Sequence, residues 1–443
     1  EMYRYNNYQY EVRFLRAYFY FNLVRQYGDV PFTDHVLSTT EVNTLTRKPA
    51  QEVFDWIIKE CDEIKDLIIP DYNNLGALVP SGESAETGRA NKRTVLALKA
   101  RTALYAASPL FNSHQEGSQG YKELWYRAAK ANKELIETCE DAGMRLIDDY
   151  ENLWDAKSYS IAIDELIFGC RAIRATNSFE KYNFPVGLEN CRGGNCPTQT
   201  LVDAYELKDS GERPDKKADY DKNKPYYEGR DPRFEKTIAK NGDTKWPNWN
   251  ETALETYQGG ANAEPLSGGT PTGYYLKKYC QTSINTTTAK PTTDNHTWII
   301  YRLGEFYLNY AEALFKYLGT AYATNNEFPI PANEMVSKTR RRTKVNMPKF
   351  PAGLDNKLWW EKYQNERMVE LAFEGHRFWD VRRWKEGDKH FSSIDEMKIY
   401  KSGDSYSYRR VTVNRQWDDK MYFFPIPQSE KAKNPNLTQN PGW

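Results

Sequence analysis

The sequence lacks an excess of charge of either sign, and it lacks long apolar runs. Its 443 residues include 61 lysines and arginines against 61 aspartates and glutamates, so the formal net charge is zero. A protein that mainly binds nucleic acid needs a basic excess to neutralise phosphates, which argues against that partner. No apolar run approaches the roughly 20 residues of a membrane-spanning helix. The chain is nevertheless long enough to bury a large core.

Signature motifs of common enzyme and cofactor sites are also missing. The sequence has no nucleophile elbow of the G-x-S-x-G type, no phosphate-binding loop and no dinucleotide fingerprint. Its histidines do not share the helical spacing of metal ligands, and none neighbours a cysteine pair; they are His35, His114, His296, His376 and His390. We therefore predict no metal and no cofactor, and we find no positive signal for an enzyme.

Cysteine is sparse, and one pair is informative. Cys191 and Cys196 bracket the turn-prone sequence RGGN, which would allow a short disulfide in an oxidising compartment. Zinc is the rival interpretation, but no second cysteine or histidine pair at ligand spacing accompanies them. The spacing favours a disulfide or free thiols over a metal site.

Helical periodicity dominates both ends of the chain and fades in the middle. The apolar spacing predicts helices over Glu11–Tyr27, Pro49–Pro70, Lys92–Ala107, Tyr121–Asp141, Tyr301–Gly319, Pro331–Lys344 and Leu354–Trp384. The first helix is expected to be mostly buried, because its arginines lie among aromatic residues. From about Asn177 to His296, glycine, proline, asparagine and threonine become frequent. A loop-rich stretch of that length is more often functional than idle.

The stretch from Glu366 to Trp384 combines dense charge with large aromatic residues. Glu366, Glu370 and Glu374 recur every four residues and so share one helix face before a break at Gly375. Paired carboxylates invite a catalytic interpretation, as acid and base. We favour a buried ion-pair network instead, with nearby arginines as partners: Arg367, Arg377, Arg382 and Arg383. The basic run Arg340–Arg342 is expected on a helix surface.

Several sequence blocks resemble one known family. ERMVELAFEGHRFWDVRRW at Glu366–Trp384 resembles the C-terminal hallmark of the SusD/RagB family, the surface nutrient-binding lipoproteins of Bacteroidetes. Further blocks match in family order: EVRFLRAYFYFNLVRQYGDVP, NKRTVLALKARTALYAASPLFN, PTQTLVDAYE, GRDPRF, GYYLKKY, FYLNYAEAL and FFPIPQSEKAKNPNLTQNPGW. Each block alone is a weak signal, but together they cover nearly the whole chain.

The resemblance implies a fold that is mainly α. It comprises four divergent tetratricopeptide-like helix pairs, forming a right-handed superhelical base, and a large irregular region. We expect a helical region over residues 1–176, a loop-rich ligand-binding region over 177–298 and a C-terminal region over 299–443 that packs on the base. Family members carry a signal, a lipidated cysteine and a further N-terminal segment, none of which is in this sequence. The chain is therefore expected to be N-terminally incomplete.

The resemblance also implies a role. The protein would be a cell-surface lipoprotein of the outer membrane, held by an N-terminal lipid anchor outside this chain. It would capture oligosaccharides and deliver them to a SusC-like TonB-dependent transporter, with the helical base as the transporter face. No bond would be broken and no cofactor used.

Sugar rings bind by stacking an apolar face on a flat aromatic ring while polar side chains bond the hydroxyl rim. The candidates are aromatic residues of the loop-rich region, with an asparagine that lies between two of them in KWPNWNE: Trp246, Asn248, Trp249, Tyr257, Tyr274 and Trp298. Such residues can instead pin a long loop to the helical base, and Trp298 is the strongest candidate for plain core. Tyr72, Asn73 and Asn74 form a weaker second patch.

Three alternatives stay open. The first is a RagB-like peptide-binding lid of a peptide transporter, which a charged cleft would favour over stacking aromatics. The second is a glycoside hydrolase that uses two of Glu366, Glu370 and Glu374. The third is a scaffold without a ligand.

Overall fold

Seven helices of nine or more residues form the body of the described chain. In this computed structural model the described residues are 2–72, 88–171, 174–214 and 228–443. The long helices are α1 (Met2–Tyr27), α2 (Ala50–Ile64), α3 (Lys92–Ala107), α4 (Gln119–Asp141), α9 (Leu303–Leu318), α10 (Ala332–Arg340) and α11 (Asn356–Glu370). The helix-rich fold predicted from the sequence is confirmed.

Short elements complete the described fold. The remaining helices are α5 (Tyr159–Ala162), α6 (Ser178–Asn183), α7 (Gln199–Ala204), α8 (Arg233–Thr237), α12 (Arg377–Arg383), α13 (Gly387–Phe391) and α14 (Gln428–Lys433). The strands pair in antiparallel twos: β1 (Val30–Pro31) with β2 (Arg47–Lys48), β3 (Leu166–Arg171) with β6 (Thr297–Arg302), β4 (Ile238–Ala239) with β5 (Tyr275–Leu276), and β7 (Ser393–Ser402) with β8 (Ser405–Asn414). None of the described helices is both long enough and apolar enough to cross a membrane.

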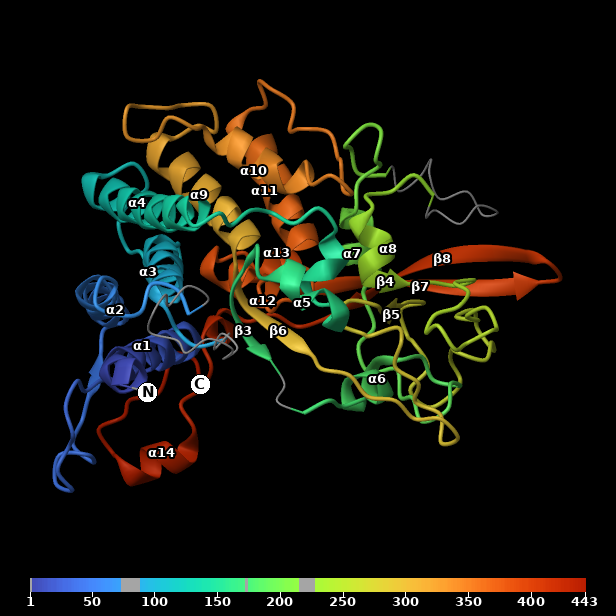
Figure 1. Cartoon of the computed structure of the whole chain (residues 1–443), viewed down its shortest axis with the longest axis horizontal. Helices are drawn as coiled ribbons and strands as arrows, with labels where there is room; N and C mark the ends of the chain where they lie inside the picture. The colour runs from blue at the N-terminus through green and yellow to red at the C-terminus, as the bar shows by residue number, and fades with distance from the viewer. Residues whose placement is uncertain (1, 73–87, 172–173, 215–227) are drawn as a thin grey trace.

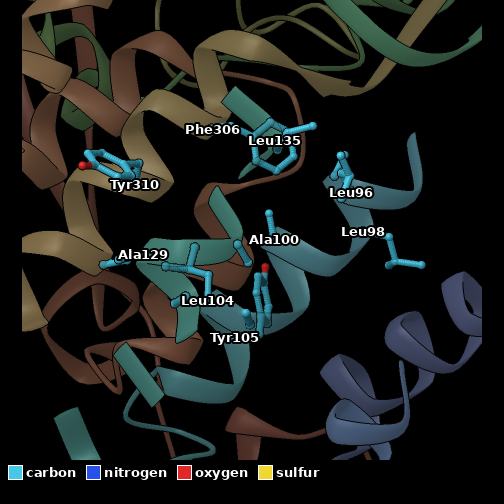
Figure 2. Close-up of a cluster of buried hydrophobic side chains, with 14 of the residues drawn as sticks. Leu96, Leu98, Ala100, Leu104, Tyr105, Ala129, Leu135, Phe306 and Tyr310 are labelled. Carbon is cyan, nitrogen blue, oxygen red and sulfur yellow. The ribbon is translucent and has the colours of Figure 1, made fainter. Parts of the chain in front are cut away.

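The long helices pack one against the next. The pairs α1–α2, α2–α3, α3–α4, α4–α9 and α9–α10 are all in contact, and Figure 1 shows them leading in an arc from α1 to α11. Leu104 and Tyr105 of α3, Leu135 of α4 and Phe306 of α9 belong to one buried cluster between these helices (Figure 2). Ala100 and its neighbours on α3 are fully buried, and such small side chains let helix axes approach closely. Each buried leucine contributes about 1.5–3 kcal/mol.

Most predicted helix ends agree with the structure. The helix α3 has the predicted bounds, and its N-cap Asn91 accepts a hydrogen bond from the backbone N–H of Thr94. Gly28 and Gly319 end α1 and α9 with φ of +71° and +76°, which glycine adopts without steric cost, whereas Gly375, with φ of +77°, ends the turn that follows α11. The helix α2 ends at Ile64, before the predicted Pro70.

Two expectations for α1 were wrong. The helix begins at Met2 rather than Glu11, because tertiary contacts extend it: the Asn7 Oδ1 accepts a hydrogen bond from the backbone N–H of Ile69 at 2.9 Å. The helix is also not mostly buried, since its neighbours cover one side only. Phe14 and Phe21 are buried, whereas Val12 and Phe19 on the other side are 63% and 59% exposed.

The loop-rich half has small cores of its own, and one of them carries a hairpin that the sequence analysis missed. The strands β7 and β8 form a ten-residue ladder that extends away from the body (Figure 1). Met397 and Ile399 are buried against a cluster that includes Val202, Tyr205 and Phe234. One face of the hairpin is therefore anchored and the other faces outward.

The C-terminal tail packs on the body. The side-chain amide of Asn440 donates hydrogen bonds to the carbonyl oxygens of Tyr27 and Phe424, at 3.0 and 2.7 Å. The Asn434 amide likewise donates to the carbonyl of Leu45 at 2.8 Å. These bonds fix an extended segment that has no ladder of its own.

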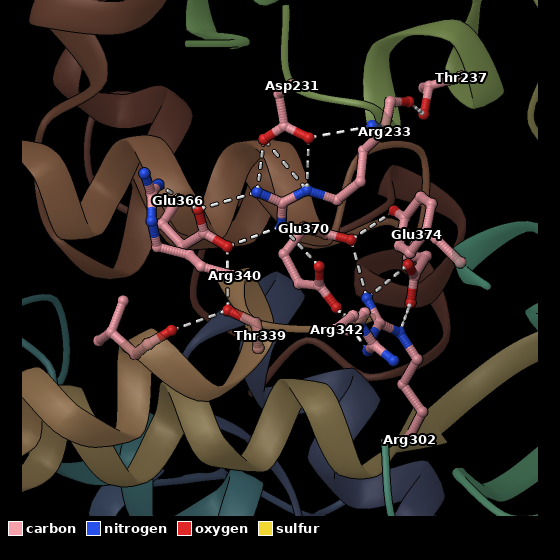
Figure 3. A network of polar contacts seen from close by, with 12 residues as sticks. Asp231, Arg233, Thr237, Arg302, Thr339, Arg340, Arg342, Glu366, Glu370 and Glu374 are labelled. Atoms are coloured by element: carbon pink, nitrogen blue, oxygen red, sulfur yellow. Dashed lines mark hydrogen bonds and ion pairs between the residues drawn. The ribbon is translucent and has the colours of Figure 1, made fainter. Parts of the chain in front are cut away.

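The three glutamates of α11 and its following turn lie in a buried ion-pair network (Figure 3). Arg233 lies 2.7 Å from both Glu366 and Glu370, and Arg302 lies 2.7 Å from both Glu370 and Glu374. The side chains of these glutamates are 1%, 0% and 1% exposed. The structural interpretation of the glutamate stripe is therefore confirmed.

The predicted partners of these glutamates were wrong. The arginines come from distant segments: Arg233 from α8, Arg302 from the end of β6, Arg340 from the end of α10 and Arg342 just after it. Arg340 and Arg342 are buried, so the expectation of a helix surface is also wrong for them. The neighbouring arginines serve other carboxylates: Arg367 pairs with Asp380, and Arg383 with both Asp380 and Glu312. Spacing along one helix could not reveal partners that the fold brings in.

Replacing Glu370 by glutamine tests the network. We expect Glu370→Gln to lower the free energy of unfolding by about 3–5 kcal/mol, because it leaves buried arginines without a counter-charge. Burial alone would raise the pKa of Glu370, but Arg342, Arg302 and Arg233 outweigh burial and lower the pKa. The stabilisation is therefore present above about pH 4.3, the ordinary value for glutamate, and is lost as the pH falls through the lower folded-state pKa.

Urea titrations at pH 7 and pH 5 measure the decrease in the free energy of unfolding that Glu370→Gln causes. We expect this decrease to be similar at both pH values. Glu334→Gln is the matched control: its partly exposed side chain pairs with Arg341 and Lys349 at the surface, so about 0–1 kcal/mol is expected. A loss for Glu370→Gln no larger than that of Glu334→Gln would show that the network is not what holds these segments together.

Candidate ligand-binding surface

The glutamate stripe does not have the properties of a catalytic pair. Burial would raise the pKa of Glu366 and of Glu374. Arg233 and Arg340 outweigh burial and lower the pKa of Glu366, and Arg302 and Lys278 do the same for Glu374. A general acid of a glycosidase needs a raised pKa and access to the substrate. These carboxylates are ionised, buried and bonded to arginines, so their geometry serves folding.

Two of the predicted ligand residues, Trp246 and Tyr274, lie in the interior. Trp246 is 5% exposed and packs with Phe184, Leu254 and Tyr275. Tyr274 is fully buried, and its hydroxyl donates a hydrogen bond to the Gln199 Oε1 at 2.6 Å. Neither ring offers a face to a ligand in this conformation.

Trp298 on β6 lies half-buried in an aromatic cluster. Its ring is parallel to that of His296, with centroids 5.6 Å apart, and it meets the rings of Tyr279 and Phe179 at 5.2 and 4.9 Å. The His296 ring is in turn held 2.9 Å from the carboxylate of Glu180. Three rings thus contact the indole, which remains only partly buried.

Asn248 and Trp249 remain at the surface, on the loop that follows Trp246. The backbone N–H of Asn248 donates to the carbonyl of Thr282 at 3.0 Å, and its side chain is exposed. The Trp249 Nε1 donates to the carbonyl of Ile284 at 2.9 Å, and the ring is half-buried. One edge of the indole is therefore anchored to the neighbouring loop while part of the ring stays accessible.

Tyr257 forms a second surface group with the hairpin. Its ring centroid lies 5.9 Å from that of Tyr406 on β8, and the Nζ of Lys401 lies 5.0 Å from the Tyr257 centroid. Tyr406 and Lys401 are direct cross-strand partners, so their side chains share one face of the hairpin, and Tyr257 contacts both of them there. A hydrogen bond to Glu255 raises the pKa of Tyr257 and keeps the phenol protonated. We name Tyr257, Lys401 and Tyr406 the hairpin platform.

Sequence reasoning missed Tyr406, Lys401 and a further exposed ring, Tyr182 on α6. Tyr182 is 57% exposed, and the guanidinium of Arg192 lies 5.0 Å from its ring centroid. A signal for the hairpin did exist: the Gly403–Asp404 turn lies between two stretches with alternating side chains, KIYKS and SYSYRR. For Tyr182 we find no signal that separates it from other tyrosines of the region.

The other sequence candidates gain no site from the structure. Tyr72 is buried, with its hydroxyl bonded to Glu11 at 2.5 Å, while Asn73 and Asn74 lie outside the described residues. All six cysteines are free thiols, and burial raises the pKa of Cys191 to about 11. Among the described residues no group of histidine, cysteine and acidic side chains is arranged to hold a metal ion.

Comparisons with known proteins agree with one another. Residues 165–443 match the model of the SusD family, and residues 2–104 match a model described as starch-binding and associating with the outer membrane. SusD-like protein P2 of Formosa agariphila is 24% identical over 441 residues, which cover 97% of this chain and 73% of that protein.

Solved structures extend the likeness to the fold. A SusD-like protein from Bacteroides fragilis superposes with a TM-score of 0.79 at 26% identity, covering 100% of this chain and 81% of that chain. A SusD-like carbohydrate-binding protein from the same species gives 0.76 at 24% identity, covering 97% and 79%. Because the SusD family model alone covers more than half of the sequence, this chain belongs to the SusD family.

Proposed function

We propose that this protein captures glycans at the cell surface, by stacking sugar rings on aromatic side chains of its loop-rich half. The observation that carries the proposal is the hairpin platform, where Tyr257 and Tyr406 lie 5.9 Å apart beside Lys401 on an irregular surface of a SusD-family chain. Two phenol rings supply apolar faces, and the ammonium group supplies donors for hydroxyl groups. Trp249 and the exposed Asn248 offer the same chemistry on a neighbouring loop.

The magnitudes suit a capture protein. Burying about 100 Å² in one ring stack contributes about 2.5 kcal/mol, less the ordering costs of association. Two such stacks give weak, reversible binding, which suits a protein that must release what it captures. The proposed partner that receives the glycan is a SusC-like TonB-dependent transporter. An outer-membrane setting is supported by the description of the family model over residues 2–104.

Loss of the platform rings tests the proposal. We expect Tyr257→Ala and Trp249→Ala each to weaken binding to a responding polysaccharide about tenfold, the equivalent of about 1.4 kcal/mol. Affinity electrophoresis and calorimetry against a polysaccharide panel measure this change. The matched control is Tyr400→Ala, which removes an exposed tyrosine from the opposite face of the same hairpin and should leave the affinity unchanged.

A tryptic peptide digest belongs in the same panel. Saturable binding to peptides alone, with Tyr257→Ala and Trp249→Ala silent, would refute glycan capture and favour a peptide-binding lid.

Trp246 and Trp249 are expected to separate stability from binding. Trp246→Ala should lower the free energy of unfolding by about 3–5 kcal/mol, because it empties a packed core position. Trp249→Ala should cost less, since that ring is only half-buried. Urea titrations compare the two, and Trp246→Phe, which keeps most of the core volume, should bind glycan like the unchanged protein. Weakened binding by a stable Trp246→Phe protein would place Trp246 in the site after all.

A further inference from the structure

A pocket that none of the platform residues lines lies between α11, the segment after α7, and α12 with α13. It is an open hollow of about 830 Å³, counting the solvent at its mouth. Leu358 and Met368 of α11 supply apolar surface, and Arg213, Arg377 and His390 supply polar surface. The part of the hollow that excludes open solvent measures about 310 Å³, at the lower end of the range of about 300–1,000 Å³ that small-molecule sites have in proteins.

The two arginines of this pocket lack a carboxylate partner within ion-pair distance among the described residues. The Arg213 Nε donates to the Asn365 Oδ1 at 2.7 Å, an uncharged acceptor. One nitrogen of Arg377, Nη2, lies 3.1 Å from the His390 Nδ1, and its buried Nη1 has no hydrogen-bond partner. By contrast, Arg233 and Arg383 each have carboxylate oxygens within 2.9 Å.

The acidic residues of the pocket wall do not neutralise these arginines. Glu206 is 2.7 Å from Arg340, and Glu212 is 2.9 Å from Lys362. Glu361 is exposed to solvent. Two acids are thus committed to other cations and the third faces water. Asp380 and Glu386 also act on Arg377 from a distance, but Asp380 pairs directly with Arg367 and Arg383, and Glu386 with Lys389 and His390.

His390 holds Arg377 without adding an anion. Its Nε2 lies 2.9 Å from the Glu386 carboxylate, so the tautomer with a proton on Nε2 donates to Glu386 and accepts from Arg377 at Nδ1. Burial lowers the pKa of His390, which keeps the ring neutral. Burial also lowers the pKa of Arg377 to about 10; the charges of Asp380 and Glu386 raise this pKa and that of Arg213 lowers it, but burial has the largest effect. An anion between the two arginines would offset the energetic cost of burying the Arg377 charge.

We infer that this pocket binds an oxyanion, the carboxylate or sulfate group of an acidic saccharide, between Arg213 and Arg377. Each guanidinium is a planar fork of donors that matches the oxygens of such a group. Leu358 and Met368 would lie against the apolar part of the same ligand. This goes beyond the proposed glycan capture, which concerns other residues, and does not depend on it.

Placing an internal carboxylate in the pocket tests the inference. Met368 is half-buried at the wall, so Met368→Glu adds a tethered anion of similar length and Met368→Gln adds the same shape without charge. Calorimetric titrations at constant ionic strength use galacturonate and sulfate as probes. We expect saturable binding of at least one probe, retained within threefold by Met368→Gln and weakened at least tenfold by Met368→Glu and by Arg377→Gln. Arg409→Gln, which removes an exposed arginine of the hairpin, should have no effect.

The two probes separate the sources of the oxyanion. Binding of galacturonate but not sulfate identifies a sugar carboxylate, and binding of sulfate alone identifies a sulfate group. Absence of saturable binding for both probes overturns the inference, and so does equal binding by Met368→Glu and Met368→Gln. Neutral polysaccharide binding by the Arg377→Gln protein should be unchanged, because Arg377 does not pack on the core that carries the platform rings. This binding reports on the hairpin platform independently of the pocket. Circular dichroism checks that each variant is folded.

Discussion

The fold depends on the compensation of buried charge around Glu366, Glu370 and Glu374. A buried carboxylate is costly unless cations and hydrogen bonds surround it, so each glutamate fixes the position of the arginines that it meets. Arg233 brings in the loop-rich half, Arg302 the end of β6, and Arg340 the end of α10. The network therefore joins segments that are far apart in sequence, and removing one member would leave several others uncompensated. The network therefore gives the loop-rich half of the molecule a rigid support.

Residues whose positions depend on local spacing were predictable from the sequence. The helix from Lys92 to Ala107 has a capping asparagine at one end, an apolar and small-residue pattern throughout and Ser108–Pro109 at the other end, and its bounds agree with the structure. Gly375 likewise marks the break after the glutamate stripe, because a left-handed turn follows there. The partners of the glutamates were not predictable, since any of the chain's arginines satisfies the same chemistry and only the tertiary fold selects among them.

The candidate site was predictable in kind but not in detail. The sequence indicated the loop-rich half, yet composition does not distinguish a ring that pins a loop from a ring that faces water. Trp246 and Trp249 are three residues apart in the same loop, and one is core while the other is half-exposed. The difference arises from neighbours such as Phe184 and Ile284, which come from other loops. Tyr406 was missed because its partner Tyr257 is about 150 residues away and is met only through the hairpin.

The contrast between the network and the pocket of Arg213 and Arg377 is itself informative. In the network, the protein places a glutamate opposite each buried arginine. At Arg213 the corresponding group is the amide of Asn365, whose Oδ1 accepts the guanidinium hydrogen bond while its Nδ2 donates to the carbonyl of Ala204 at 2.8 Å. The amide orients Arg213 without neutralising it, just as the neutral ring of His390 orients Arg377. Two arginines held in place by uncharged acceptors keep their charge available, and a hollow between such groups favours a ligand that brings its own negative charge.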